Sequence, residues 1–138
     1  MKHLTEFLTE SLATPQVFII VKPGSLQHTQ AVIELFAENG WDVSRTTTKQ
    51  LLLKEAKQLY AVHKKESFYD DLCEYMTSGQ CRAFIIEKPN VLDPFGEVKK
   101  IKDEIREKYG ESDMRNVLHS SDSKENMEKE ASLFFQAL

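Results

Sequence analysis

One histidine of this chain stands where chemistry on an anion is feasible. His119 lies between a short apolar run, Val117-Leu118, and a segment with helical periodicity. Neutral imidazole is a good nucleophile near pH 7, because its ordinary pKa is about 6.5. The amides and dipole at a helix N-terminus attract anions such as phosphate. His119 is therefore a candidate nucleophile, although a histidine before a helix is more often a turn or packing residue.

A helix is expected directly after this histidine. Asp122 and Glu125 have the spacing of a capping box, in which two side chains satisfy free amides at a helix N-terminus. Apolar side chains then recur at helical intervals, at Met127, Ala131, Leu133 and Phe134. The imidazole would thus lie beside the positive end of the helix dipole.

Composition indicates one compact domain. The chain has 138 residues, of which 41% are hydrophobic and 29% are charged, and a second domain has no room. The formal net charge of −4 argues against general binding to nucleic acid or to an anionic membrane, since both are negatively charged. No apolar run approaches the length of a membrane span.

The cysteines and the first residues bear on the cellular compartment. Cys73 and Cys81 lack the spacing of a CxxC motif, so we expect buried reduced thiols rather than a disulfide or a metal site. The N-terminal residues include Glu6 and Glu10 but no arginine, unlike a mitochondrial presequence. We therefore expect a cytoplasmic protein.

Strands and helices are expected to alternate along the chain. Strand patterns cover residues 17–21, 41–47, 82–86 and 117–118. Helical patterns cover residues 29–39, Thr48 to His63, Ser67 to Gly79 and Asp93 to Lys108, in addition to the helix after His119. A further amphipathic helix is expected at residues 3–13, before Pro15.

This order predicts an α+β fold. Interleaved strands and helices in so short a chain favour a ferredoxin-like four-stranded antiparallel sheet with helices packed on one face. Residues 1–14 would form a helical extension, and residues 15–138 would form the domain. Lys22 would emerge at the end of the first strand, before the turn at Pro23-Gly24. The fold alone assigns no function.

Five segments of the chain, in order, resemble nucleoside diphosphate kinase. They are Phe18–Pro23, Tyr60 with Lys64 and Phe68, Tyr75–Gly79, Ile105-Arg106, and Arg115–Ser123 with Glu130. The resemblance implies a kinase that moves the γ-phosphate of a nucleoside triphosphate to a nucleoside diphosphate in two ping-pong steps. It also implies that His119 carries the phosphate as phosphohistidine between them.

The resemblance further implies roles around His119. Glu130 would orient the imidazole, and Ser121 would support His119 through its hydroxyl. Lys22 would neutralise charge on the transferred phosphoryl group, and Tyr60 would place a hydroxyl near it. Ordinary alternatives exist for each: a solvated helix glutamate, a cap residue, a loop lysine and a core tyrosine with a wet tip.

Nucleotide binding is implied in the same way. Arg106 and Lys22 would bind phosphate oxygens, Phe68 would stack on the base, and Asn116 would bond the ribose hydroxyls. Mg²⁺ would bridge the phosphates with few protein ligands, and no residue is assigned as a metal ligand. A surface charge, helix packing and a turn are the alternative roles of Arg106, Phe68 and Asn116. The resemblance also implies a homo-oligomer, a dimer or larger.

The chain departs from the family pattern in several places, three of which concern the nucleotide site. The loop after the first strand is short, and so is the region between Glu87 and Ile105, which lacks the family's phosphate-binding arginine and threonine. Lys99, Lys100 or Lys102 could replace them, but a lysine forms no bidentate contact, and weaker nucleotide clamping is expected. Ser120 stands where the family has glycine, and a positive φ there would be strained.

Three functions are compatible with these residues. The favoured one is an active kinase of broad base specificity, because the nucleophile and its implied helpers remain. The second is a nucleotide-binding or regulatory module without catalysis, which the shortened regions suggest. The third is an interaction domain that uses the helix at residues 3–13 as its partner surface.

Overall fold

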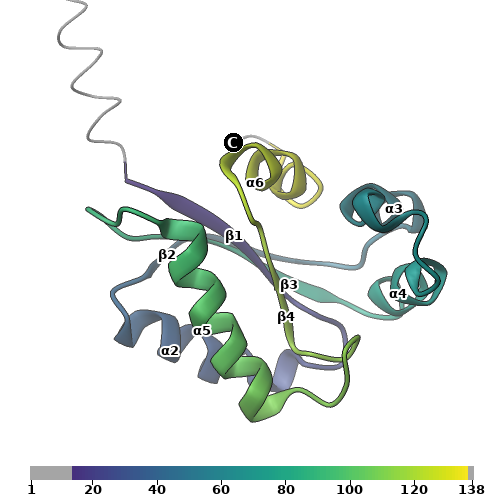
Figure 1. Cartoon of the computed structure of the whole chain (residues 1–138), viewed down its shortest axis with the longest axis horizontal. Coiled ribbons are helices and arrows are strands. Elements are labelled where there is room, and N and C mark those ends of the chain that lie inside the picture. The colour runs from purple at the N-terminus through teal and green to yellow at the C-terminus, as the bar shows by residue number, and fades with distance from the viewer. Residues whose placement is uncertain (1–13, 137–138) are drawn as a thin grey trace, which may run out of the picture.

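The sheet has four strands in the order β2-β3-β1-β4, and every neighbouring pair is antiparallel. The strands are β1 (Gln16–Val21), β2 (Asp42–Lys49), β3 (Cys81–Glu87) and β4 (Leu118–Ser120). The computed structural model describes residues 14–136. The helix expected at residues 3–13 therefore lies outside the described residues, while the ferredoxin-like α+β sheet is confirmed (Figure 1).

Helices connect the strands in the expected order. They are α2 (Thr29–Glu38), α3 (Leu53–Leu59), α4 (Tyr69–Met76), α5 (Pro94–Tyr109) and α6 (Lys124–Ala131), with single 3-10 turns at Leu26–His28 and Ala61–His63. None of the helices within residues 14–136 is long and apolar enough to cross a lipid bilayer.

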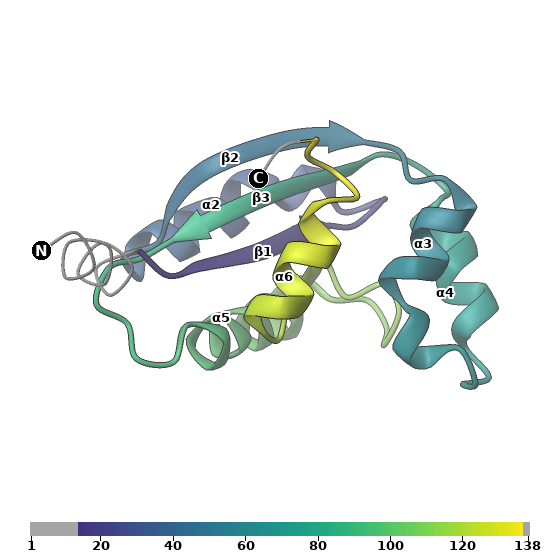
Figure 2. The same ribbon diagram turned by 90° about the horizontal axis from the view of Figure 1, so that it is seen from above.

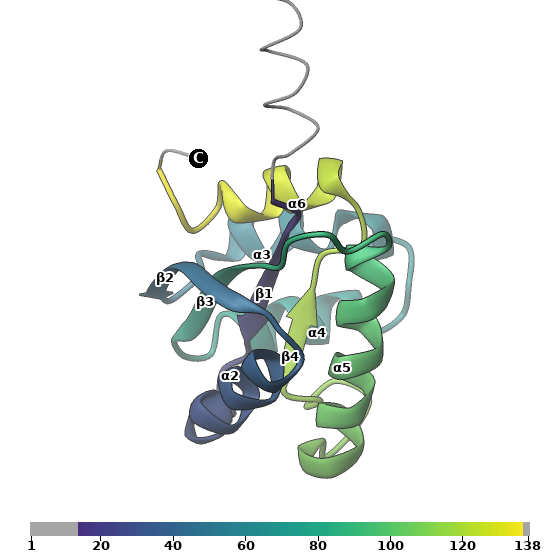
Figure 3. The ribbon, with the colours of Figure 1, turned by 90° about the vertical axis from the view of Figure 1, so that its left-hand side faces the viewer.

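Both faces of the sheet are covered by helices, so the expectation of helices on one face is wrong. The reason lies in β1, where residues 17–21 are all fully buried although successive side chains point to opposite faces. Val17, Ile19 and Val21 pack under α2 and α5. Phe18 and Ile20 pack under α3, α4 and α6 on the other face. Figure 3 shows the sheet between these two layers.

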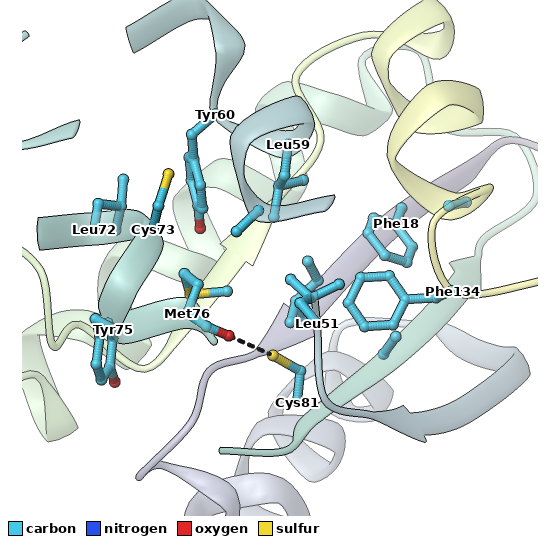
Figure 4. Close-up of a cluster of buried hydrophobic side chains, with 14 of the residues drawn as sticks. Phe18, Leu51, Leu59, Tyr60, Leu72, Cys73, Tyr75, Met76, Cys81 and Phe134 are labelled. Carbon is cyan, nitrogen blue, oxygen red and sulfur yellow. Dashed lines mark hydrogen bonds between the residues drawn. The ribbon is translucent and has the colours of Figure 1, made fainter. Parts of the chain in front are cut away.

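The second of these layers contains both cysteines. Cys73 and Cys81 are free buried thiols, as expected, within the cluster that Figure 4 shows around Met76 and Phe134. The Cys81 thiol lies 3.9 Å from the Met76 carbonyl oxygen. Burial raises the pKa of Cys81 to about 12. Burial also raises the pKa of Cys73, so neither thiol is ionised at neutral pH.

Three expected helix starts are wrong. Thr48 belongs to β2, and α3 begins after Leu52, whose amide donates to the Glu55 carboxylate at 2.9 Å. The cap of α4 is Phe68 rather than Ser67. Ser123 caps α6 by accepting from the Asn126 amide at 3.2 Å, so Asp122 and Glu125 form no capping box. In each case the chain enters the helix one to four residues later than the capping residue type suggests.

Candidate active site

His119 lies in the middle of β4 and pairs with Ile20 of the central strand. After β4 the chain turns into α6, which packs back over β1 and brings Glu130 to the imidazole (Figure 1). The Nε2–H of His119 donates a hydrogen bond to Oε1 of Glu130. Both side chains are largely buried, so the contact fixes the ring orientation and leaves Nδ1 as the free nitrogen.

Tyr60 packs its ring edge-on against His119, with ring centroids 5.8 Å apart. Its hydroxyl is buried and has no hydrogen-bond partner within the described chain. Burial raises the pKa of Tyr60 above its ordinary value, so the hydroxyl stays protonated. Figure 4 shows Tyr60 at the end of the buried cluster that α3 and α4 form with the sheet. The hydroxyl is thus a neutral donor without a protein acceptor.

Lys22 follows β1 and is buried, with only 4% of its surface exposed. Its ammonium donates to Oδ1 of Asn116 at 2.6 Å and lies 3.4 Å from the Met114 carbonyl oxygen. Burial, together with the positive charges of Arg106 and Lys102, lowers the pKa of Lys22 to about 7. A buried amine without a carboxylate partner is unusual in a stable core. An anionic ligand in this site would therefore stabilise the protonated form of the Lys22 amine.

Arg106 extends from α5 to the strand that carries His119. One terminal nitrogen donates to the Leu118 carbonyl oxygen at 2.8 Å, while Nε is buried and finds no partner among the residues that the structure describes. Burial lowers the pKa of Arg106, yet a guanidinium remains charged at neutral pH. Arg106 therefore presents a fixed positive charge one residue from the imidazole.

A strained turn leads into β4. Val117 has a φ of 79°, and the Leu118 amide donates to the Asn116 carbonyl oxygen at 3.0 Å, which is a γ-turn. The Lys22 amide donates to the Val117 carbonyl oxygen at 2.8 Å and holds the turn against β1. The expected strain at Ser120 is wrong, because Ser120 is an ordinary strand residue and the positive φ falls at Val117.

Phe68 stands outside this group, at the start of α4. It is 42% exposed, and its ring centroid lies 5.4 Å from that of His63. Figure 2 shows α3 and α4 at one end of the sheet, beyond α6. An exposed aromatic face on this hairpin is free to stack on a planar ligand.

Comparison with known proteins identifies the family. A family model described as nucleoside diphosphate kinase matches residues 15–138. The chain belongs to the nucleoside diphosphate kinase family. The nucleoside diphosphate kinase of Chlorobium limicola is 35% identical over 127 residues, covering 86% of this chain and 91% of the relative. The nucleoside diphosphate kinase of Thermosipho africanus is 30% identical over 129 residues, covering 87% of this chain and 88% of the relative. Family membership makes the protein a phosphotransferase, as the resemblance implies.

Solved structures of nucleoside diphosphate kinases share the fold. The Aquifex aeolicus enzyme aligns with a TM-score of 0.73 at 25% identity, over 89% of this chain and 96% of the other. A halophilic enzyme from Halobacterium salinarum, solved in complex with CDP, aligns with a TM-score of 0.79 at 24% identity, over 91% and 90%. These alignments agree with the ferredoxin-like sheet described above.

The structure gathers most of the expected site residues around His119 and leaves Phe68 apart from them. The structure brings together His119, Glu130 and Tyr60, and beside them Lys22, Asn116 and Arg106. Phe68 connects to this group through His63, whose ring lies between Tyr60 and Phe68 at centroid distances of 6.5 and 5.4 Å. Sequence reasoning gave His63 no role at the site, although its spacing of three from Tyr60 places it on the same side of a helical turn.

Ser121 contacts the backbone of β1 rather than His119. Its hydroxyl accepts a hydrogen bond from the buried Phe18 amide at 3.1 Å. We expect Ser121→Ala to lower the free energy of unfolding by about 1–3 kcal/mol, because the Phe18 amide loses its partner. Urea unfolding of the variant measures this loss, with Ser67→Ala at an exposed position as the control. Unchanged stability together with slower phosphorylation would instead assign the hydroxyl to His119.

Proposed function

We propose that the protein catalyses ping-pong transfer of the γ-phosphate from a nucleoside triphosphate to a nucleoside diphosphate through a phosphohistidine at His119. The observation that carries this proposal is the hydrogen bond from His119 Nε2 to Glu130. Beside it lie Lys22 and Arg106, which form no ion pair with a carboxylate from residues 14–136. In the first step, the Nδ1 lone pair forms a bond to the γ-phosphorus, and the bond from that phosphorus to the β-phosphate oxygen breaks. A second nucleoside diphosphate then takes the phosphoryl group by the reverse chemistry.

Charge around the imidazole supports this transfer. Lys22 and Arg106 lie beside His119, where negative charge gathers on the equatorial oxygens during phosphoryl transfer. Arg106 Nε and the Tyr60 hydroxyl are buried donors that have no acceptor within residues 14–136. Phosphate oxygens would satisfy both donors, and their charge would raise the pKa of Lys22 so that its amine is protonated when nucleotide is bound.

The remainder of the nucleotide would extend from His119 toward α4. Phe68 would stack on the base, and because stacking tolerates every base, we propose broad base specificity. Asn116 would form hydrogen bonds with the ribose hydroxyls while its Oδ1 accepts the hydrogen bond from Lys22. These roles are proposals that rest on the exposure of Phe68 and the placement of Asn116.

We propose that Mg²⁺ enters as the complex with the nucleotide. Within residues 14–136, no group of three or more histidine, cysteine or acidic side chains could hold a metal ion. In a magnesium–nucleotide complex the substrate phosphates coordinate the ion, and the protein would supply few ligands. The ion would neutralise part of the phosphate charge.

We also propose a homo-oligomer and a cytoplasmic location. β2 is an edge strand, and most of its residues are exposed, so a second copy has an available surface. The two buried reduced thiols suit a reducing compartment. Light scattering of the purified protein tests the first proposal, and a monomer would contradict it.

Incubation with a nucleoside triphosphate labelled at the γ-phosphate tests the main proposal. We expect an acid-labile, alkali-stable phosphoprotein that any nucleoside diphosphate discharges, because phosphohistidine is the only covalent intermediate. Nucleotide binding without labelling would favour a regulatory module. Neither binding nor labelling would favour an interaction domain.

The Glu130 carboxylate gives a second test through ring orientation. We expect Glu130→Gln to lower kcat/KM by about 10- to 100-fold, because an amide stabilises the charged imidazole less and holds its tautomer less firmly. Steady-state transfer from ATP to a diphosphate measures the loss. Glu128→Gln, an exposed position on the same helix, is the matched control. Equal activity of the two variants would remove Glu130 from the mechanism.

A further inference from the structure

A third cation, Lys102, lies beside Lys22 and Arg106 and is unpaired within the described part of the chain. The ammonium group of Lys102 repels that of Lys22, and the guanidinium of Arg106 repels Lys102 in turn. Lys22 bonds Asn116, and Arg106 bonds the Leu118 carbonyl. Lys102, by contrast, forms no hydrogen bond and no ion pair with any residue from 14 to 136.

The position of Lys102 on α5 directs it to the site. Lys102 precedes Arg106 by four residues, which places both side chains on one face of the helix. This face lies along β4, because Arg106 reaches the residue before His119 (Figure 3). Lys102 is partly buried, whereas Lys99 and Lys100 are exposed. The structure therefore distinguishes one of three neighbouring lysines.

Among residues 14–136, the charges around Lys102 include two carboxylates, but neither forms an ion pair with it. Burial lowers the pKa of Lys102, and the charges of Arg106 and Lys99 lower it further. The carboxylates of Asp103 and Asp122 oppose this effect without forming an ion pair. Like charges held together in a partly buried site destabilise the free protein. A ligand that carries several negative charges would relieve this repulsion.

We propose that Lys102 binds the phosphate chain of the nucleotide as a third cationic contact beside Lys22 and Arg106. The inference rests on the proposed phosphotransfer function and names a residue of its substrate site. A lysine offers a point charge rather than a planar fork, so its contribution is to affinity more than to alignment of the reacting atoms. Lys102 is accordingly a binding residue.

Lys102→Gln tests this proposal against Lys100→Gln, which removes the same charge from an exposed position on the same helix. The affinities of ADP and of adenosine are measured for both variants by calorimetry or NMR titration. We expect Lys102→Gln to weaken ADP binding about tenfold, the value of one charged hydrogen bond, and to leave adenosine binding unchanged. Lys100→Gln should change neither by more than about twofold. Lys102→Arg should restore ADP binding, since the charge returns.

Three outcomes separate this proposal from the proposed function. Wild-type ADP affinity in Lys102→Gln would overturn the role of Lys102 and leave phosphohistidine chemistry untouched. Equal weakening of ADP and adenosine binding would also overturn it, because the side chain would then act through the fold. If the wild-type protein binds ADP but forms no phosphohistidine, the proposed function fails, and the ADP affinities still decide the role of Lys102.

Discussion

Replacing His119 with glutamine should abolish the kinase reaction, with a fall of at least about 10⁴-fold in kcat/KM. Glutamine can still bond Glu130, but it has no nitrogen lone pair that attacks phosphorus. Every other group in the site stabilises charge or orients a partner, so no other single substitution should remove as much activity. The measurements are transfer from ATP to a nucleoside diphosphate and the yield of labelled protein.

His28→Gln is the matched control for this variant. His28 stacks on Tyr109, with ring centroids 4.5 Å apart, and within residues 14–136 it contacts none of the site side chains. We expect its activity to remain within about twofold of wild type. A labelled His119→Gln protein would show that a different nucleophile accepts the phosphate, and the proposed mechanism would be wrong.

Lys22→Met should change activity and stability in opposite directions. The variant should lose about 10²- to 10³-fold in kcat/KM, because it lacks the buried charge beside the transferred phosphoryl group. Its free energy of unfolding should rise by about 1–4 kcal/mol at neutral pH, because methionine fills similar space without the desolvation cost of an amine. A gain in stability with a loss of function is the expected signature of a residue retained for its chemistry.

The pH dependence of stability gives an independent check on Lys22. Its pKa in the folded protein is about 7, below the ordinary value of about 10.4 in an unfolded chain. Between these values the unfolded chain binds more protons, so this residue makes stability rise with pH from about 7 to about 10. Below about pH 7 the amine is protonated in both states, and the full free-energy cost of burying its charge is present. The advantage of Lys22→Met over wild type should therefore shrink as the pH rises through this window.

Urea unfolding at several pH values measures both effects. Lys54→Met, which removes a charge from an exposed position on α3, serves as the control and should show neither the gain in stability nor the loss of activity. A destabilised Lys22→Met protein would mean that the bond to Asn116 outweighs the cost of burying the amine. The cationic interpretation of the site would then need revision.

Much of the fold follows from local pattern. Five consecutive apolar residues at 17–21 predict a central strand, and alternating helical segments predict an α+β sheet. The same five residues also imply that both faces are covered, which the expectation of a single helical layer overlooked. Helix starts were less predictable because Thr48, Ser67 and Asp122 have suitable side chains, whereas tertiary contacts decide where the backbone turns.

The site was predictable only through family resemblance. His119 and Glu130 are eleven residues apart, a spacing that no single helix or strand converts into contact. The bond from Lys22 to Asn116 joins residues 94 positions apart. Lys102 differs from Lys99 and Lys100 in being partly buried, and this difference depends on how α5 is rotated against β4. The contact of Ser121 with Phe18 likewise depends on how the last strand pairs with the first.

That pairing of the first strand with the last has a consequence for biosynthesis. β1 is made early, but one of its edges stays open until residues 116–121 arrive to bond Lys22 and Phe18. Contacts so distant in sequence form slowly, and an exposed apolar strand invites aggregation until they form. On the ribosome, Lys22 and Tyr60 are therefore synthesised long before the proposed nucleophile, His119. Catalytic competence should appear only when synthesis is nearly complete, and chains released early should carry no phosphate.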